Sequence, residues 1–111
     1  MKVEQKNVFV GNWYYTEVVR NNSLTKFNKG SDLIFIDDES GYFSKQNGEK
    51  INFTYEVKDT TILFVLKNAD SNLFFSKQTE FDYELRNEEK YTKLFLKSVI
   101  SDEKHVFVKS K

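Results

Sequence analysis

The sequence predicts an all-β domain, an antiparallel up-and-down meander of about eight to nine strands that closes into a small barrel. Apolar and polar residues alternate with a period of two along almost the whole chain, and turn residues separate the alternating segments at even spacing. Successive hairpins also keep one apolar face continuous. With 111 residues, the chain is expected to form a single domain, 1–111. The expected strands cover residues 9–19, 33–36, 41–45, 51–57, 62–67, 72–76, 80–86, 91–100 and 105–109.

The composition excludes several classes of function. Hydrophobic residues make up 39% of the chain and aromatic residues 16%, which argues against intrinsic disorder. Lys+Arg and Asp+Glu number 17 each, so the chain lacks the positive charge of a general nucleic-acid-binding protein. With no Cys and one His, thiolate metal sites, multi-histidine sites and cysteine nucleophiles are excluded. We therefore expect no cofactor and no metal.

No targeting or membrane segment is evident. The chain has no run of about 18 apolar residues, so no transmembrane helix is expected. Residues 1–10 lack the apolar stretch of a signal peptide. The sequence as written is expected to be cytoplasmic, and an exported or periplasmic protein whose signal peptide had been removed would look the same.

Turn residues predict how the first hairpins pair. Asn47-Gly48 is the strongest hairpin signal, and a two-residue turn there places Tyr42 opposite Phe53. A turn at residues 59–60 then places Tyr55 opposite Phe64. Because a slip by one residue would exchange the two faces of a strand, this register yields a testable list of inward-facing side chains.

The later hairpins extend the same apolar face. Loops over residues 68–71 and 77–79 place Phe64 opposite Phe75, and Phe75 opposite Phe81. A turn at residues 88–89 then places Tyr83 opposite Leu94. Five successive hairpins in this register support the meander topology.

The outer face of the hairpin around residues 88–89 carries complementary charges. The predicted register pairs Glu84 with Lys93 and Glu80 with Lys97, as oppositely charged neighbours across a sheet should pair. A charge-paired outer face explains these carboxylates better than a general acid–base pair does. We therefore expect no catalytic residue and no enzyme activity.

The last strand allows two orientations. A turn near residues 102–103 permits either His105 and Phe107, or Val106 and Val108, to face inward. We expect Val106 and Val108 to lie inside, because that arrangement leaves the imidazole in solvent.

Residues 20–30 break the alternation and carry no strand signal. They are expected to form either an ordinary loop or a short lid over the barrel. In the second case Leu24 and Phe27 would be the lid residues.

The first strand opens with Gly11-Asn12-Trp13-Tyr14-Tyr15. A Gly-x-Trp at the start of an all-β meander resembles the lipocalin signature, and the chain looks most like the short lipocalin-like (calycin-type) domains of bacteria. Such a Trp plugs one end of the barrel, with a buried ring and an N–H that needs a partner. The resemblance implies a barrel that binds a small ligand.

One family feature has no direct counterpart here. In lipocalins an Arg from a late strand usually stacks on that Trp. The last strand of this chain offers only Lys104 and Lys109, and Arg86 on an earlier strand is the alternative cation.

The predicted interior supplies the candidate ligand site. An eight-stranded barrel is just wide enough either to be filled by side chains or to hold one small ligand. Apolar walls with a few polar groups are typical of small-molecule sites. The candidate ligand-binding residues are Trp13, Tyr15, Tyr42, Phe53, Tyr55, Phe64, Phe75, Phe81 and Tyr83.

The outward face holds a candidate partner surface, because contiguous exposed apolar residues usually mark an interaction site. Its residues are Leu63, Val65, Phe74 and Phe95. Two functions follow as alternatives. The first is a small non-catalytic lipocalin-like protein that holds an apolar or amphipathic ligand. The second is a filled barrel that binds a protein partner, as an inhibitor or neutralising protein or as a homodimer.

Overall fold

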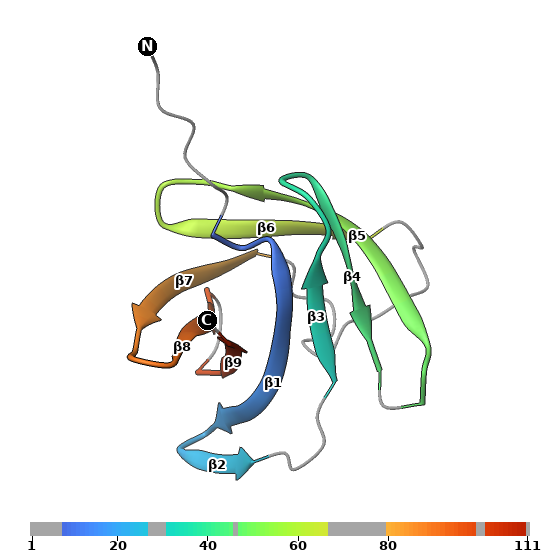
Figure 1. Cartoon of the computed structure of the whole chain (residues 1–111). Coiled ribbons are helices and arrows are strands. Elements are labelled where there is room, and N and C mark those ends of the chain that lie inside the picture. Colours follow the sequence, from blue (N-terminus) through green and yellow to red (C-terminus); the bar gives the residue numbers. More distant parts are fainter. Residues whose placement is uncertain (1–7, 27–30, 46, 67–79, 100–101, 111) are drawn as a thin grey trace.

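The computed structural model describes residues 8–26, 31–45, 47–66, 80–99 and 102–110, and these residues form strands and turns without a helix. The predicted all-β class is confirmed (Figure 1). The strands are β1 (Gly11–Arg20), β2 (Ser23–Lys26), β3 (Asp32–Phe35), β4 (Ser40–Ser44), β5 (Lys50–Val57), β6 (Thr61–Leu66), β7 (Glu80–Asn87), β8 (Tyr91–Ser98) and β9 (Lys104–Ser110).

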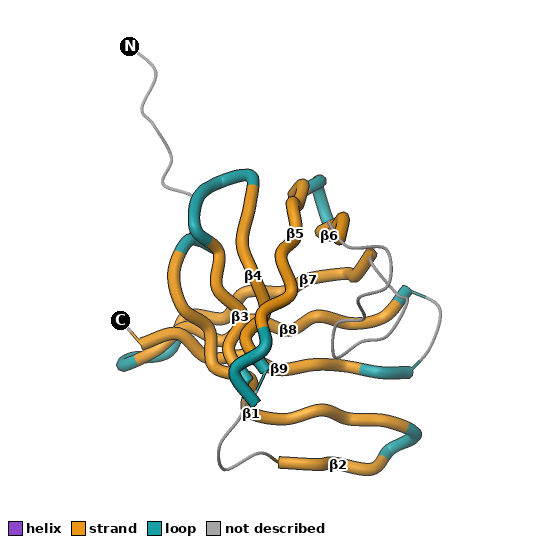
Figure 2. The backbone as a smooth tube through the Cα atoms, turned by 90° about the vertical axis from the view of Figure 1, so that its right-hand side faces the viewer, coloured by secondary structure: helices purple, strands orange, loops and turns teal. Residues whose placement is uncertain are grey.

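Eight of these strands close into an antiparallel barrel. The sheet order is β2-β1-β3-β4-β5-β6-β7-β8-β9, and an additional pairing of β1 with β9 closes it. One edge of β1 pairs with β3 and then with β2, while the other edge pairs with β9. The short strand β2 therefore lies outside the closed barrel, beside β1 (Figure 2).

Because neighbouring strands are antiparallel, the turns alternate between two ends of the barrel. The turns β3–β4, β5–β6 and β7–β8 lie at the end where β1 begins, which we call the Trp13 end. The β1–β2 hairpin and the β4–β5 turn lie at the opposite end, which we call the β2 end. In Figure 1 the β3–β4 turn is at the top and the β1–β2 hairpin at the bottom.

The predicted register of β5 and β6 is confirmed. Tyr55 lies opposite Phe64, and Val57 lies opposite Ile62. A short turn fixes this register, since the Lys58 N–H donates to the Thr61 carbonyl at 2.7 Å. The buried, inward-facing residues alternate with exposed ones along β5 and with half-buried or exposed ones along β6, as the sequence pattern predicts.

The predicted register of β4 and β5 is wrong by one residue. Tyr42 pairs with Asn52 rather than Phe53, and Phe43 faces inward instead. The loop between Lys45 and Glu49 has three residues rather than two, because Gly48 adopts a φ of 91° that L-residues avoid. Tyr42 lies half-buried on the outer face, with the Lys50 ammonium 4.8 Å from its ring centroid.

The β7–β8 hairpin is shifted by two residues from the prediction, so each side chain stays on its predicted face. Its turn residues are 89–90, and Tyr83 lies opposite Leu96 rather than Leu94.

Neither predicted ion pair across that hairpin forms. Glu84 lies opposite Phe95 and accepts from Arg86 at 3.0 Å, because the shift moves Lys93 away from it. Glu80 pairs with Lys58 of the neighbouring turn, with 3.6 Å between nitrogen and oxygen.

The expected orientation of the last strand is also wrong. His105 and Phe107 face inward and are fully buried, while Val108 is half-buried on the outer face. Val106 lies in the alternate position on β9, outside the core cluster, although it is also buried. The imidazole tolerates the interior because the Tyr15 hydroxyl bonds to it.

The expected loop at residues 20–30 instead contains β2. Asn21 and Asn22 form its turn with φ values of 51° and 65°, a conformation that Asn tolerates better than most residues. Leu24 pairs with Val19 of β1 and is 53% exposed, so it is not a lid residue. Phe27 lies outside the described residues.

The predicted strand at residues 72–76 lies outside the described part of the chain, as do Phe74 and Phe75. Within the described part, β6 pairs directly with β7, and Ile62 lies opposite Phe81.

Candidate functional site: the barrel interior

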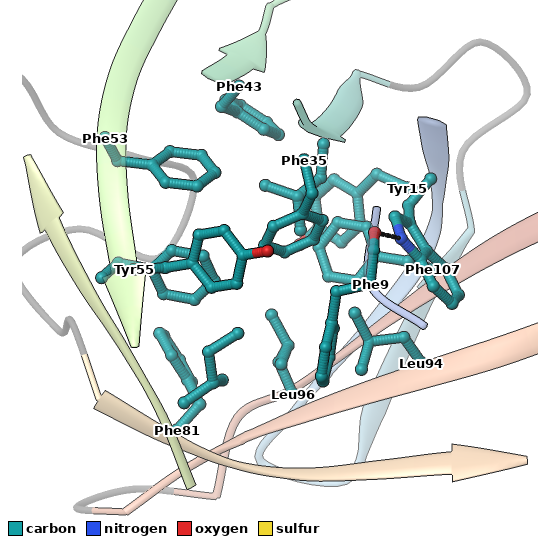
Figure 3. Packing of buried hydrophobic residues seen from close by; sticks show 14 of the residues in the cluster. Phe9, Tyr15, Phe35, Phe43, Phe53, Tyr55, Phe81, Leu94, Leu96 and Phe107 are labelled. Atoms are coloured by element: carbon teal, nitrogen blue, oxygen red, sulfur yellow. Dashed lines mark hydrogen bonds between the residues drawn. The ribbon is translucent and has the colours of Figure 1, made fainter. Parts of the chain in front are cut away.

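The Trp13 end of the barrel is filled by aromatic side chains. Trp13 is fully buried, as predicted, and its Nε1–H donates to the Phe9 carbonyl at 2.8 Å. The Phe9 ring lies 5.6 Å from the Phe35 ring of β3 and 5.3 Å from the Tyr83 ring of β7. Because β3 and β7 belong to opposite walls, Phe9 bridges the barrel at this end. The dashed line in Figure 3 marks the hydrogen bond from the Trp13 indole to the Phe9 carbonyl.

The last strand places the ammonium of Lys109, rather than an arginine, against the tryptophan ring. The Lys109 Nζ lies 4.8 Å from the Trp13 ring centroid and donates to the Val8 and Val10 carbonyls at 2.6 and 3.0 Å. Partial burial lowers the pKa of the Lys109 ammonium. The alternative cation, Arg86, instead lies 4.9 Å from the Phe95 ring on the outer face.

Gly41 allows close packing next to the β3–β4 turn, at the Trp13 end of the barrel. A Cβ at this position would collide with the Ile34 carbonyl oxygen and lie 3.0 Å from the Phe53 ring. Without that Cβ, the Phe35 and Phe53 rings approach to 5.8 Å in an edge-on contact. Strand β4 therefore needs a glycine at position 41, which faces the interior.

A continuous series of rings leads from the middle toward the β2 end. The Phe64 ring lies 5.0 Å from Phe53 and 6.2 Å from Phe81, and the Phe81 ring lies 6.0 Å from His105. All three contacts are edge-on, the geometry that aromatic pairs prefer. Phe81 and Leu96, which belong to the same buried cluster, lie in the lower half of Figure 3.

Two hydroxyl groups place polar atoms among these rings. The Tyr15 hydroxyl lies 2.6 Å from His105 Nδ1. The Tyr55 hydroxyl donates to the Asp37 carbonyl at 2.6 Å, near the Trp13 end. The interior is thus mainly apolar, with one polar pair toward the β2 end and one hydroxyl group near the Trp13 end.

Burial shifts both titratable groups of the Tyr15–His105 pair. It raises the pKa of the Tyr15 phenol far above its ordinary value. It lowers the pKa of the His105 imidazole to about 4, although the Glu103 carboxylate opposes that shift. At neutral pH the tyrosine is therefore protonated and the histidine uncharged.

Most of the predicted interior residues meet inside the barrel. Trp13, Tyr15, Phe53, Tyr55, Phe64 and Phe81 are all buried in one cluster, and Tyr83 packs partly buried against it. Tyr42 is the exception, on the outer face, and Phe75 is outside the described residues. The cluster also contains residues absent from the predicted site, among them Phe9, Leu33, Phe35, Phe43 and Phe107. The sequence does contain a signal for two of them, because Leu33 and Phe35 alternate within the predicted strand 33–36 and could have been assigned to the interior.

The structure describes three of the four residues of the candidate partner surface. Leu63 and Val65 face outward on β6, and Val65 is 54% exposed. Phe95 lies on the outer face of β8, separated from them by the acidic strand β7. Phe74, the proposed centre, is outside the described residues.

Fold and interior together define a closed eight-stranded antiparallel β-barrel, an architecture consistent with a lipocalin-like barrel. No family model, curated protein or solved structure matches the chain. Among the residues that the structure describes, there is no helix long and apolar enough to cross a membrane.

Proposed function

We propose that this protein is a small, non-catalytic, lipocalin-like binding protein that holds an apolar or amphipathic ligand at the β2 end of the barrel. The Tyr15–His105 pair carries the proposal, because it places two polar groups among the apolar rings at that end. Such walls with a few convergent polar groups are characteristic of small-molecule sites.

The position of the site follows from the packing at the two ends. Phe9 bridges opposite walls at the Trp13 end, so a ligand has to enter from the β2 end. There the ligand's apolar part would lie against Phe64 and Phe81, and a polar group would reach Tyr15 or His105.

The chemistry of the pair supports binding rather than catalysis. With its raised pKa, the Tyr15 phenol keeps its proton and is a poor nucleophile. An imidazole whose pKa is about 4 is a weak base at neutral pH.

An apolar fluorescent probe, N-phenyl-1-naphthylamine, tests the proposal, and native mass spectrometry of untreated protein tests for co-purified ligand. Phe64→Trp enlarges an inward-facing side chain and should weaken probe binding by about tenfold or more. Val65→Trp is the matched control. Val65 is the next residue along β6, and because its side chain faces solvent, this substitution should leave probe binding unchanged. If the wild type binds no probe and carries no ligand, the barrel is filled and the proposal fails.

A second candidate function is self-association through the outer face of β8, β9 and β1. On this face Tyr14 is 49% exposed and lies opposite the half-buried Val108, and the half-buried Phe95 lies opposite the buried Val106. Lysines of β8 and β9 lie next to these apolar side chains, and acidic residues of β7 lie on the neighbouring strand. In a two-fold dimer, the lysines of each copy could therefore face the acidic residues of the other copy.

Sedimentation equilibrium over a range of protein concentrations tests this second candidate. Val108→Asp should abolish a wild-type dimer, while Val65→Asp, on the exposed face of β6, should not. A wild type that stays monomeric at the highest concentration rules it out.

A further inference from the structure

A chain of polar side chains runs from the barrel interior to the surface at the seam where β1 and β9 close the barrel. The Tyr15 hydroxyl lies 2.6 Å from His105 Nδ1, and His105 Nε2 lies 3.2 Å from Glu103 Oε1. Glu103 Oε2 in turn lies 3.2 Å from Arg20 Nε. The imidazole is fully buried, whereas about half of the Arg20 side chain is exposed.

The contacts define one consistent set of proton positions. The Tyr15 phenol retains its proton and can donate it to His105 Nδ1 when that nitrogen is unprotonated. The single imidazole proton is then on Nε2, facing the Glu103 carboxylate. The other tautomer would set the Nε2 lone pair against a carboxylate, which is unfavourable.

Protonation of His105 breaks this arrangement. Nδ1 would become a donor, so the Tyr15 hydroxyl would have to reverse its role and accept from Nδ1, which could no longer accept the hydroxyl proton. The new positive charge would lie among aromatic rings, with Phe81 at 6.0 Å and the Tyr15 ring at 5.7 Å. The charged groups that act on it are the Glu103 carboxylate, which favours the charge, and the Arg20 guanidinium, which opposes it.

The position of His105 links its protonation to barrel closure. On β9 it lies opposite Val18 of β1 and Leu96 of β8, at the β2 end of the seam. The register of β1 against β9 also shifts between Tyr15 and Glu17, which locally interrupts the ladder. The Tyr15–His105 bond is thus a side-chain tie across the seam beside this irregularity.

We propose that Tyr15, His105 and Glu103 form an acid-sensitive latch that keeps the β2 end of the barrel closed and opens it when the imidazole is protonated. If the barrel binds a ligand as proposed above, opening of the seam in acid would also release that ligand, and this part of the inference rests on the proposed function. The opening of the seam itself does not depend on any ligand.

Hydrogen exchange measured by NMR, corrected for the intrinsic pH dependence, tests the latch without a ligand. Between about pH 7 and pH 4, amide exchange of Val106 and Phe107 should accelerate by about tenfold or more relative to Phe53 and Tyr55 of β5. In His105→Phe, which keeps a buried ring that cannot ionise, this relative acceleration should disappear. Equal acceleration in the two proteins would overturn the latch.

Direct titration of the wild-type imidazole keeps the proposal testable if His105→Phe does not fold. Nitrogen chemical shifts should report the Nε2–H tautomer and an imidazole pKa below about 5. An ordinary pKa, or the Nδ1–H tautomer, would overturn the proposal.

The probe N-phenyl-1-naphthylamine separates the latch from the proposed function. If both are correct, probe affinity should fall by about tenfold near pH 4 in the wild type but not in His105→Phe. If the seam loosens in acid but no probe binds at any pH, the latch stands and the binding function fails. If the probe binds with the same affinity at both pH values and seam exchange does not change, the latch fails and the binding function stands.

Discussion

Acidification should destabilise the wild-type protein more than His105→Phe. The ordinary pKa of histidine is 6.5, and burial lowers that of His105 to about 4 in the folded protein. Between these values the unfolded chain binds a proton that the folded protein does not bind, so stability falls as the pH falls. The stabilisation is fully present above about pH 6.5 and is lost progressively down to about pH 4.

The size of the effect follows from the difference between the two pKa values. A difference of about 2.5 pH units corresponds to about 3 kcal/mol of unfolding free energy. That amount is a large fraction of the roughly 5–15 kcal/mol typical of a domain. Because His105 is fully buried, solvent does not screen this contribution.

Urea denaturation followed by Trp13 fluorescence at several pH values measures the effect. The variant retains every other acidic group, including Asp37, whose pKa is lowered by hydrogen bonds from the Glu39 and Ser40 amides. The difference between the two proteins therefore isolates His105. If both lose the same free energy between about pH 6.5 and pH 4, the reasoning from a buried neutral imidazole is refuted.

Three further predictions concern the packing around the barrel. Trp13→Ala should lower the unfolding free energy by about 3–5 kcal/mol, and wild-type emission should be blue-shifted and poorly quenched; an unchanged urea midpoint would contradict this. Gly41→Ala should cost about 1–3 kcal/mol by thermal unfolding, because the new Cβ meets the rigid Ile34 carbonyl; a neutral result would mean that the backbone relaxes freely. Lys109→Met should cost about 1–2 kcal/mol and make Trp13 easier to quench with acrylamide, since two backbone carbonyls lose their donor. Lys109→Arg, which keeps the cation, should recover most of that loss.

The sequence alone determined the features that depend on local pattern. Alternation of apolar and polar residues with a period of two predicts the strands. The short turn between Val57 and Ile62 predicts the β5–β6 register, because the strands on both sides of it alternate without interruption. The burial of Trp13 is equally predictable, since a single large apolar ring in the first strand gains most from the interior.

The register of β4 against β5 depended on tertiary packing. Asn47-Gly48 is compatible with a two-residue or a three-residue loop, and the two differ in whether Tyr42 or Phe43 faces inward. The structure buries Phe43, which has no hydroxyl that needs a partner in the core. The turn motif contains no information about that choice.

The orientation of β9 was decided only when the barrel closed. On sequence grounds a buried imidazole is costly, which favours Val106 and Val108 inside. The partner that removes this cost, the Tyr15 hydroxyl, lies 90 positions away in the chain and comes within 2.6 Å of His105 only through the β1–β9 pairing. Local patterns report the preference of each residue for water or core, whereas a hydrogen bond across the closing seam exists only in the assembled fold.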